Sequence, residues 1–437
     1  MKKSIALVIA VFMLMSVVVG CKSNTPATKK TGYNGTKLVF ACLDTTIYRK
    51  LDNLIAPLKK ATGIDLTIDY IPEADYMTKL QVVLSAGTGE YDAVYANNKM
   101  FGTLYASGWL QPLDAMMKDT TKTDANFNYA DFNPKIAEAL VYKNQIMGIP
   151  FGAESDILYY NKAMFTAAGL TTPPKTFEDV YNYAKILNKP DQGQAGIAML
   201  GTASGDVNSY GWIMLWLSMG GSWTPPGEQP YTVLADDVAI RATTMYSDML
   251  MKYGPKGVAN YGWNELYLAM QQKKVAMVIA TTKDYPTFVD PTKSQIGSDL
   301  GYAALAGMGN DYTVGNIGSW SIPKSGKNIS AAWKAIQYMT GKDAELIQVT
   351  QKDDVNSVRQ SVLSSSTFTS KYNKEWAAAT NEAFAHGAVQ YTPLIPQGGQ
   401  IRDYLSIALA KVLSGQATPT QAMTEANNNV KTLLKTS

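Results

Sequence analysis

The sequence predicts an α/β protein that folds as two doubly wound lobes joined by a hinge. Three observations support this fold class. About 400 residues follow an N-terminal leader, which is too many for one ordinary hydrophobic core. Residues 37–96 alternate as strand, helix, strand, helix, strand, a pattern typical of a parallel sheet. Residues 148–161 then form a short apolar stretch of the kind expected where a chain crosses between lobes.

The N-terminus has the pattern of a targeting segment. Lys2 and Lys3 precede an apolar run, Ile5–Val19, that is shorter than the ~20 residues a membrane-spanning helix needs. The run ends in VVGC, which is similar to a bacterial lipobox, so residues 1–20 are expected to be a lipoprotein signal peptide and Cys21 the lipidated residue. Two acyl groups on such a cysteine give stable membrane attachment. The alternative is a plain secretory signal with an incidental cysteine.

Residues 21–36 are expected to form the lipidated cysteine and a flexible tether, because residues 22–36 are polar and rich in Thr, Lys, Gly and Asn. This predicts an extracytoplasmic protein held at the outer face of the bacterial cell membrane. Removing Lys2 and Lys3 lowers the net charge from +3 to +1, and no block of like charge appears, so a nucleic-acid partner is not indicated. Cys42 is the only other cysteine and is expected in the core of a strand, with no disulfide.

The first lobe begins with regular strand and helix patterns. Glycines 63 and 87 are suited to end its two helices. The predicted strands are Lys37–Leu43, Ile64–Ile71 and Tyr91–Ala96, and the predicted helices are Tyr48–Thr62 and Asp75–Ala86. In doubly wound sheets ligands bind beyond the carboxyl ends of the strands, where Asp44, Thr45, Asn97 and Asn98 lie.

The stretch GIPFGAESDILYYN is predicted to consist of two extended pieces, Ile149–Gly152 and Asp156–Tyr160, with Glu154 in a small turn between them. A helix follows the second piece, and a further helix is predicted to be capped by Thr176, with Asp179 three residues later. A turn between two buried elements is a natural crossing point between lobes.

The second lobe is predicted to contain two helices with tryptophans. Trp212 and Trp216 lie four residues apart on one face of the helix Ser209–Gly220. The helix Tyr261–Lys274 carries Trp263 and is followed by a strand that runs into Thr282.

The segment PFGAESDILYYNKAMFTAAGLTTPPKTFEDV resembles the corresponding segment of family 1 extracellular solute-binding proteins of ABC importers, the maltose-binding-protein-like sugar receptors. The YYN triplet, the glycine, the PP pair and the capped helix stand at the family's spacing. The similarity runs from about Lys37 to the C-terminus. It implies a periplasmic-binding-protein-like type II fold, with residues 37–152 plus 301–350 as the N-terminal lobe and residues 153–300 plus 351–437 as the C-terminal lobe.

The resemblance also implies a function. The chain is expected to be the lipid-anchored substrate-binding component of an ABC importer, which binds a sugar, oligosaccharide or sugar alcohol between the lobes and delivers it to the membrane permease subunits. A monomer with no cofactor is expected.

Sugar hydroxyls donate and accept hydrogen bonds, and sugar C–H faces stack on aromatic rings, so acids, amides, arginines and tryptophans are the candidate contacts. By resemblance, Glu154 stands at the position of a ligand-binding acid, Trp320 at that of a stacking tryptophan, and Arg402 near that of a second one. The candidate ligand-binding residues are Asp44, Asn97, Asn98, Glu154, Trp212, Trp216, Trp263, Thr282, Trp320, Arg359 and Arg402.

Most of the candidates also have a purely structural alternative. Glu154 could form a hinge salt bridge, Asn97 a turn, and Asp44 the N-terminal cap of the first helix. The tryptophans could belong to the core and Arg359 to a surface ion pair.

Catalytic and metal sites are not indicated. His386 is the only histidine, so histidine-based triads and multi-histidine metal sites are disfavoured. The rival hypothesis is a secreted, surface-bound carbohydrate-active enzyme, which requires two carboxyl groups ~5–9.5 Å apart across one cleft. Asp44 and Glu154 are the pair that could supply them.

Overall fold

The computed structural model describes residues 32–226, 230–305, 312–351, 356–388 and 392–435. The predicted signal peptide, Cys21 and most of the tether therefore lie outside the described residues. No helix among the described residues is both long and apolar enough to cross a membrane.

The first half of the molecule is built on three parallel strands. β1 (Lys37–Leu43) lies between β2 (Asp65–Ile71) and β3 (Ala93–Ala96), in register from Lys37 opposite Asp65 to Leu43 opposite Ile71. Two helices connect these strands: α1 (Asp52–Thr62) after a single 3₁₀ turn, and α2 (Glu73–Ala86). Both end at glycines with positive φ, Gly63 (78°) and Gly87 (64°), as predicted from the sequence.

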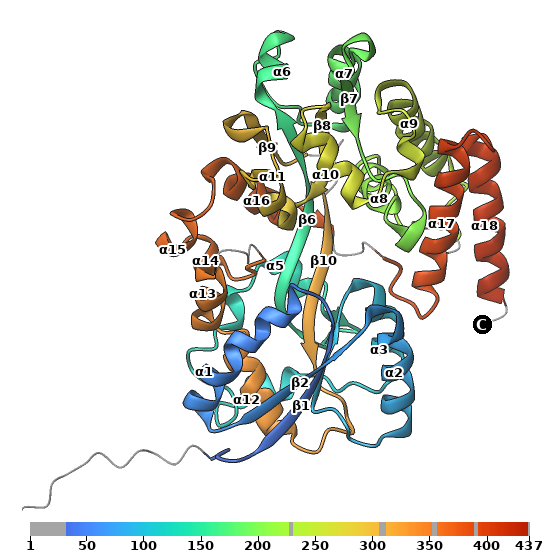
Figure 1. The fold of residues 1–437 in the computed structure, drawn as a ribbon. Coiled ribbons are helices and arrows are strands. Elements are labelled where there is room, and N and C mark those ends of the chain that lie inside the picture. The colour runs from blue at the N-terminus through green and yellow to red at the C-terminus, as the bar shows by residue number, and fades with distance from the viewer. Residues whose placement is uncertain (1–31, 227–229, 306–311, 352–355, 389–391, 436–437) are drawn as a thin grey trace, which may run out of the picture.

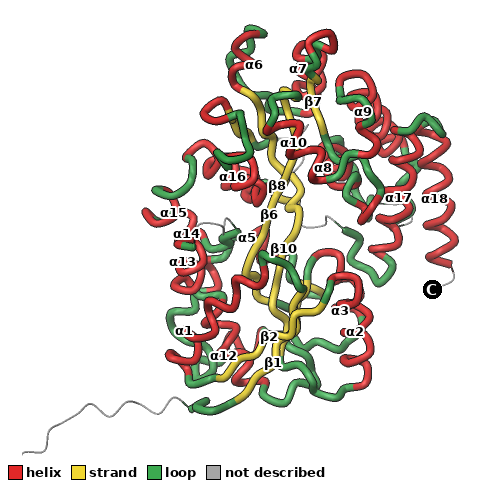
Figure 2. The backbone as a smooth tube through the Cα atoms, in the orientation of Figure 1, coloured by secondary structure: helices red, strands yellow, loops and turns green. Residues whose placement is uncertain are grey.

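Two long strands connect this half to the second. β6 (Ile149–Asn161) and β10 (Tyr312–Ser321) run antiparallel through the centre of the molecule, as Figure 2 shows. In the described part of the chain the main sheet follows the order β2-β1-β3-β10-β6-β8-β7. The end of β10 pairs with β3, and the end of β6 pairs with β8 (Val275–Thr281) and β9 (Leu300–Ala303).

β6 differs from its prediction. Glu154 does not lie in a turn, because residues 149–161 form one unbroken strand. Its first part pairs with β10 and its second part with β8, so partners more than 100 residues away keep the chain extended through Pro150 and Gly152. The predicted cap of the helix α7 (Phe177–Leu187) is confirmed, with Thr176 and Asp179 forming a capping box.

The remaining elements cover both halves of the sheet (Figure 1). Those between β3 and β6 are α3 (Asn98–Ala106), α4 (Asp114–Lys118), α5 (Pro134–Glu138), β4 (Val141–Tyr142) and β5 (Gln145–Ile146). Those of the second half are α6 (Lys162–Ala167), β7 (Ala195–Ala198), α8 (Ser209–Ser218), α9 (Asp237–Tyr253), α10 (Trp263–Gln271) and α11 (Tyr285–Val289). Those after β10 are α12 (Ile329–Met339), α13 (Lys342–Thr350), α14 (Gln360–Leu363), α15 (Ser366–Thr369), α16 (Lys374–Ala385), β11 (Gly387–Ala388), α17 (Gly398–Leu413) and α18 (Pro419–Lys435).

The residues that follow α13 still make contacts with the first half. α14 packs on α13, which itself contacts α1 and α12 of the first half. The side chain of Arg359 bonds to the carbonyl oxygens of Phe127 and Asn128, also in the first half. Asn356 accepts a hydrogen bond of 3.3 Å from the backbone of Ala153 on β6, and α16 packs on β6 and β9 further along the chain.

Candidate functional site

A cleft of about 380 Å³ lies between the two halves of the molecule, beside the strands β6 and β10. The first half contributes residues that follow β1 and β3, and the second half contributes residues that begin α8 and α10 and one from α17. This is the edge at which doubly wound sheets bind ligands. The polar and aromatic residues that line the cleft are Thr45, Tyr48, Glu73, Tyr95, Asn97, Asn98, Lys99, Glu154, Tyr210, Trp263, Lys283, Asn316 and Arg402.

Glu154 and Lys283 form an ion pair beside the strands. Glu154 lies on β6, and its carboxylate oxygen is 2.7 Å from Nζ of Lys283, which follows β8. The Lys283 ammonium also lies 5.8 Å from the ring centroid of Trp263, the first residue of α10. The pair offers a ligand both hydrogen-bond acceptors and donors next to an aromatic face.

Burial governs the ionisation of the acids here. It raises the pKa of Glu154, and the Lys283 ammonium offsets part of that effect. Two residues further along β6, burial raises the pKa of Asp156 to about 7, and the nearby charges of Glu154 and Asp284 add to the increase. Burial lowers the pKa of Lys283, but the carboxylates of Glu154 and Asp284 outweigh this and raise it above its ordinary value.

The wall of the first half is organised by the start of α3. Asn97 is its N-cap: its side-chain oxygen accepts a bond from the Lys99 backbone, and its amide donates to the Tyr95 hydroxyl at 3.2 Å. The Tyr95 hydroxyl is also 2.7 Å from that of Tyr48. Asn98 accepts a bond of 2.6 Å from the backbone nitrogen of Ile317, which fastens α3 to β10. Asn97 therefore both forms the turn and faces the cleft.

The wall of the second half is centred on Arg402, which comes from α17. Its guanidinium lies 5.0 Å from the ring centroid of Tyr210 and 3.2 Å from the carboxylate of Asp206. It also donates to the hydroxyl of Ser209 at 2.8 Å and to that of Thr392 at 3.2 Å. Arginine held by a ring and by hydroxyl groups is well suited to contact a polyhydroxylated ligand.

Three predicted tryptophans do not line the cleft. Trp212 and Trp216 are completely buried and stack on each other, 5.5 Å between centroids, inside the second half. Trp320 is also completely buried, between Phe40 and Phe151, each 5.1 Å away. Trp212 and Trp216 were candidates from one face of a helix and Trp320 from the resemblance, but the side chains of all three are buried in the two cores, as the structural alternative expected. Of the predicted tryptophans, only Trp263 reaches the cleft.

Three predicted polar residues are likewise placed elsewhere. Asp44 forms an exposed ion pair with Arg49 at 2.6 Å. The Thr282 hydroxyl accepts a bond from the Ser155 backbone and is completely buried. Arg359 is buried rather than on the surface and bonds to backbone carbonyls of the first half. The carboxyl pair Asp44 and Glu154, on which the enzyme hypothesis relied, is therefore not brought together across the cleft.

The predictions missed several cleft residues that adjoin predicted ones. Lys283 follows Thr282 and Lys99 follows Asn98, while Thr45, placed at the same strand end as Asp44, lines the cleft although Asp44 does not. At Thr282 and Asp44 the right loop was chosen but not the right residue, whereas Asn98 and Lys99 both line the cleft. Tyr48, Tyr95, Tyr210 and Asn316 carried no signal that distinguished them from other aromatic or polar residues of the chain.

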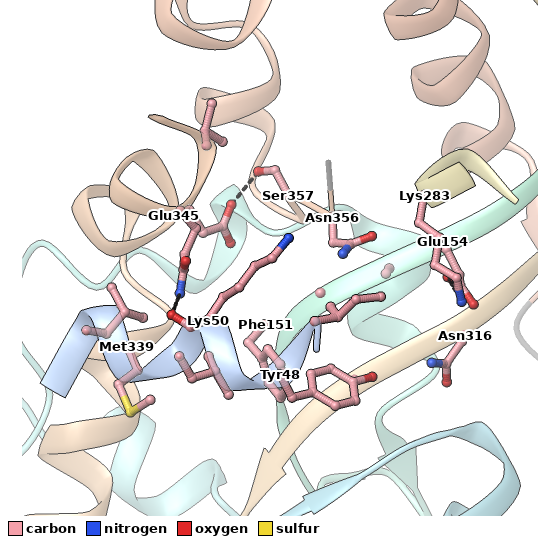
Figure 3. Close-up of a pocket in the computed structure, with 18 residues that line it drawn as sticks. Tyr48, Lys50, Phe151, Glu154, Lys283, Asn316, Met339, Glu345, Asn356 and Ser357 are labelled. Atoms are coloured by element: carbon pink, nitrogen blue, oxygen red, sulfur yellow. Dashed lines mark hydrogen bonds and ion pairs between the residues drawn. The ribbon is translucent and has the colours of Figure 1, made fainter. Parts of the chain in front are cut away.

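A second, smaller hollow of about 70 Å³ adjoins the cleft on the other side of Tyr48 (Figure 3). It shares Ile47, Tyr48, Glu154, Lys283 and Asn316 with the cleft. Its other lining residues come from the 3₁₀ turn before α1, from α1, β6, β10, α12 and α13, and from residues 356–357. Ser357 donates a hydrogen bond to Glu345 on its far wall, as Figure 3 shows. The described residues contain no cluster of histidine, cysteine or acidic side chains that could hold a metal ion.

Comparison with known proteins gives a consistent result. Residues 44–346 match the family model described as bacterial extracellular solute-binding protein. Over 322 residues the chain is 26% identical to an erythritol/L-threitol-binding protein of Mycolicibacterium smegmatis, an alignment that covers 71% of this chain and 67% of that protein. A mannitol-binding protein of Pseudomonas aeruginosa is 27% identical over 58% of this chain and 57% of that protein.

Solved structures support the same fold. An ABC transporter solute-binding protein of Agrobacterium radiobacter, crystallised in complex with ribitol, superposes with a TM-score of 0.76 at 26% identity, over 92% of this chain and 99% of that one. A maltose-bound protein of T. maritima superposes with a TM-score of 0.74 at 18% identity, over 91% of this chain and 100% of that one, and shows the likeness of fold alone. The predicted type II fold is confirmed.

Proposed function

The chain belongs to the family of bacterial extracellular solute-binding proteins, and from this premise we propose that it is the receptor of an ABC importer for a sugar alcohol or a sugar. Proteins of this family bind solutes and are not enzymes. The rival hypothesis of a carbohydrate-active enzyme is therefore set aside.

The observation that carries the proposal is the chemistry of the cleft. Three cations, Lys99, Lys283 and Arg402, line the cleft with two carboxylates, Glu73 and Glu154. Asp206 does not line it but pairs with both Lys99 and Arg402, so these six charges balance and leave no excess to attract an ion. Amide, hydroxyl and charged groups alternate with the rings of Tyr210 and Trp263. A neutral ligand with many hydroxyl groups satisfies such donors and acceptors, whereas a ligand without them leaves the buried groups unpaired, at ~1–3 kcal/mol each.

The named relatives favour a sugar alcohol within this class. Erythritol, threitol, mannitol and ribitol, the solutes in the names and descriptions of three similar proteins, are all acyclic chains that carry a hydroxyl on every carbon. Candidate ligand contacts in this chain are Asn97, Glu154, Trp263, Lys283, Asn316 and Arg402.

The rest of the proposal concerns the cellular location of the protein and its interaction with the permease subunits. Closure of the two lobes over the ligand would bury it and present surfaces of both lobes to the permease subunits. Cys21 would carry the lipid that holds this monomer at the outer face of the cell membrane. Cys21→Ser should release the protein from salt-washed membranes, and its retention there would contradict the anchor.

A thermal-shift screen with erythritol, ribitol, mannitol and maltotriose tests the ligand class. A ligand at 100 times its dissociation constant should stabilise the protein by about 2.7 kcal/mol. Titration calorimetry should then give weaker binding for Glu154→Gln, because the ion pair with Lys283 is lost. The recovered ligand should be chemically unchanged. No shift with any of the four compounds, or with other sugars, would contradict the proposal.

A further inference from the structure

The two halves touch directly near the cleft, between α3 and the segment that precedes α17. Residues 392–397, which precede α17, lie against α3 of the first half (Figure 1). The hydroxyl of Thr103 on α3 donates to the backbone oxygen of Pro396 at 3.3 Å. We call this contact between α3 and residues 392–397 the end wall.

Gly102 is the residue of α3 that permits the end wall. A Cβ atom built at Gly102 would overlap the carbonyl oxygen of Ile395 and would lie 2.7 Å from both the backbone nitrogen and the carbonyl carbon of that residue. Backbone atoms cannot rotate away as a side chain can, so any larger residue must push residues 392–397 away from α3. Glycine is otherwise unfavourable inside a helix, so its presence in the middle of α3 is explained by this close approach.

A series of polar side-chain contacts connects the end wall to residues that line the cleft. Nζ of Lys99, one helical turn before Thr103, is 2.8 Å from the carboxylate of Asp206 in the second half. The same carboxylate is 3.2 Å from Arg402, which in turn donates to Thr392 of the end wall. Lys99 and Asp206 therefore bridge the halves at the same end of the cleft as Gly102.

We propose that the end wall limits the length of the ligand, and that Gly102 is a specificity-determining residue because it lets the wall form. The inference rests on the proposed function and refines it: the ligand is one short acyclic polyol or one monosaccharide, and a longer oligosaccharide is excluded. The cleft volume of about 380 Å³ lies near the lower end of the usual range for ligand pockets, ~300–1,000 Å³. The strands β6 and β10 bound the same cleft with Glu154 and Asn316.

The substitution Gly102→Ala tests the end wall, with titration calorimetry against erythritol, ribitol, mannitol and maltotriose alongside melting curves of the unliganded protein. The wild type should bind at least one of the four-, five- or six-carbon polyols and should bind maltotriose at least 10-fold more weakly. Gly102→Ala should weaken polyol binding by at least 10-fold. Its unliganded melting temperature should stay equal to or above that of the wild type, because alanine favours the helix and the proposed open state of the unliganded protein lacks the contact.

Gly399→Ala is the matched control. Gly399 lies in the first turn of α17, and a Cβ built on it meets nothing within 4 Å, so both affinity and melting temperature should match the wild type. Equal polyol affinity in Gly102→Ala and the wild type would overturn the inference, as would tight maltotriose binding by the wild type, while the proposed function stood. A fall in the unliganded melting temperature of Gly102→Ala would overturn it too, since the contact would then belong to the fold. Failure of the wild type to bind any polyol or sugar would overturn both.

Discussion

Arg359 and Arg402 are both almost completely buried, and each lies 3.2 Å from an aspartate, yet their surroundings differ. Arg359 donates to three backbone carbonyls, those of Phe127, Asn128 and Thr340, and its guanidinium lies 4.0 Å from the ring centroid of Phe132. Arg402 instead donates to the side-chain hydroxyls of Ser209 and Thr392 and lines the cleft.

The difference shows how one residue type serves the fold in one place and a site in another. Backbone carbonyls are fixed, so Arg359 ties three chain segments together and has no freedom to meet a ligand. Hydroxyl groups rotate and can either accept or donate, so the partners of Arg402 can adjust when a ligand hydroxyl arrives. The two arginines should therefore respond differently to substitution, to pH and to ligand.

The largest expected effect is on stability. Arg359→Met removes the donor of three buried carbonyls and one partner of the Asp131 ion pair, so the free energy of unfolding should fall by about 3–5 kcal/mol, as measured by urea denaturation. Arg241→Met, at an exposed position of α9, should change it by less than about 0.5 kcal/mol. If the free energy of unfolding of Arg359→Met fell by less than about 1 kcal/mol, Arg359 would not serve the fold in the way that distinguishes it from Arg402.

The second effect is on how the free energy of unfolding depends on pH, which should differ between Asp156, near the cleft, and Asp131, beside Arg359. Burial and the charges of Glu154 and Asp284 raise the pKa of Asp156 to about 7, against the opposing charges of Lys283 and Arg402. The folded protein therefore binds a proton that the unfolded chain releases above about pH 4, and the free energy of unfolding falls as pH rises from about 4 to about 7. Asp156→Asn should remove this loss and be more stable than the wild type by on the order of 2–4 kcal/mol at pH 8.

The region of Arg359 should show the opposite sign. Burial raises the pKa of Asp131, but hydrogen bonds from Ser361 and Arg359 outweigh it and hold that pKa below its ordinary value. The stability it contributes is present above the ordinary pKa of an aspartate and is lost as pH falls. Urea denaturation of the wild type, Asp156→Asn and Asp131→Asn from pH 3 to pH 8 measures the pH dependence of stability that each aspartate contributes. Equal stability of Asp156→Asn and the wild type at all pH values would contradict the raised pKa.

The third effect is on binding. Arg402→Met should weaken polyol binding by about 10- to 100-fold, or ~1.5–3 kcal/mol, because charge-assisted bonds to ligand hydroxyls are lost. Its stability should fall less than that of Arg359→Met, since Asp206 keeps its partner Lys99 at 2.8 Å. Calorimetric titration and urea denaturation measure the two quantities. A large loss of stability with unchanged affinity would place Arg402 with Arg359 as a residue of the fold.

The smallest effect concerns an aromatic ring of the cleft. Trp263→Ala should weaken polyol binding by about 1 kcal/mol, because one stacking face beside Lys283 is lost. Its unliganded stability should change little, since the ring is only partly buried. Trp109→Ala, at a partly buried position that does not line the cleft, should leave the calorimetric affinity unchanged. Equal affinities in all three proteins would exclude Trp263 from the site.

Local patterns predicted the local structure well. β1 and the helices that end at Gly63 and Gly87 follow from alternation and from glycine at positive φ, both of which depend on neighbouring residues. The continuity of β6 could not be predicted in this way, because Pro150 and Gly152 suggest a break and the strand is kept extended by β10 and β8. Long-range pairing decided the outcome there.

The site was predicted in part for the same reason. Asn97, Asn98, Glu154, Trp263 and Arg402 line the cleft, in keeping with the loops and the resemblance that suggested them. Trp212, Trp216 and Trp320 do not, because the direction of a side chain depends on how its helix or strand packs, which a single sequence does not specify. Element ends were predictable, whereas side-chain direction was not.

The pairing of β6 with β10 sets the mechanics of the molecule. The two strands cross between the halves as one hydrogen-bonded ribbon, and the register shifts between Val314 and Asn316, opposite Ser155 and Glu154. A bulge concentrates twist, so rotation of one half against the other is a torsion of this ribbon that breaks none of its bonds. Points near a torsion axis travel least. In the proposed closure, Glu154 and Asn316 on this ribbon would therefore move least and the end wall would move further, so a solute would meet the strand residues first and the end wall last.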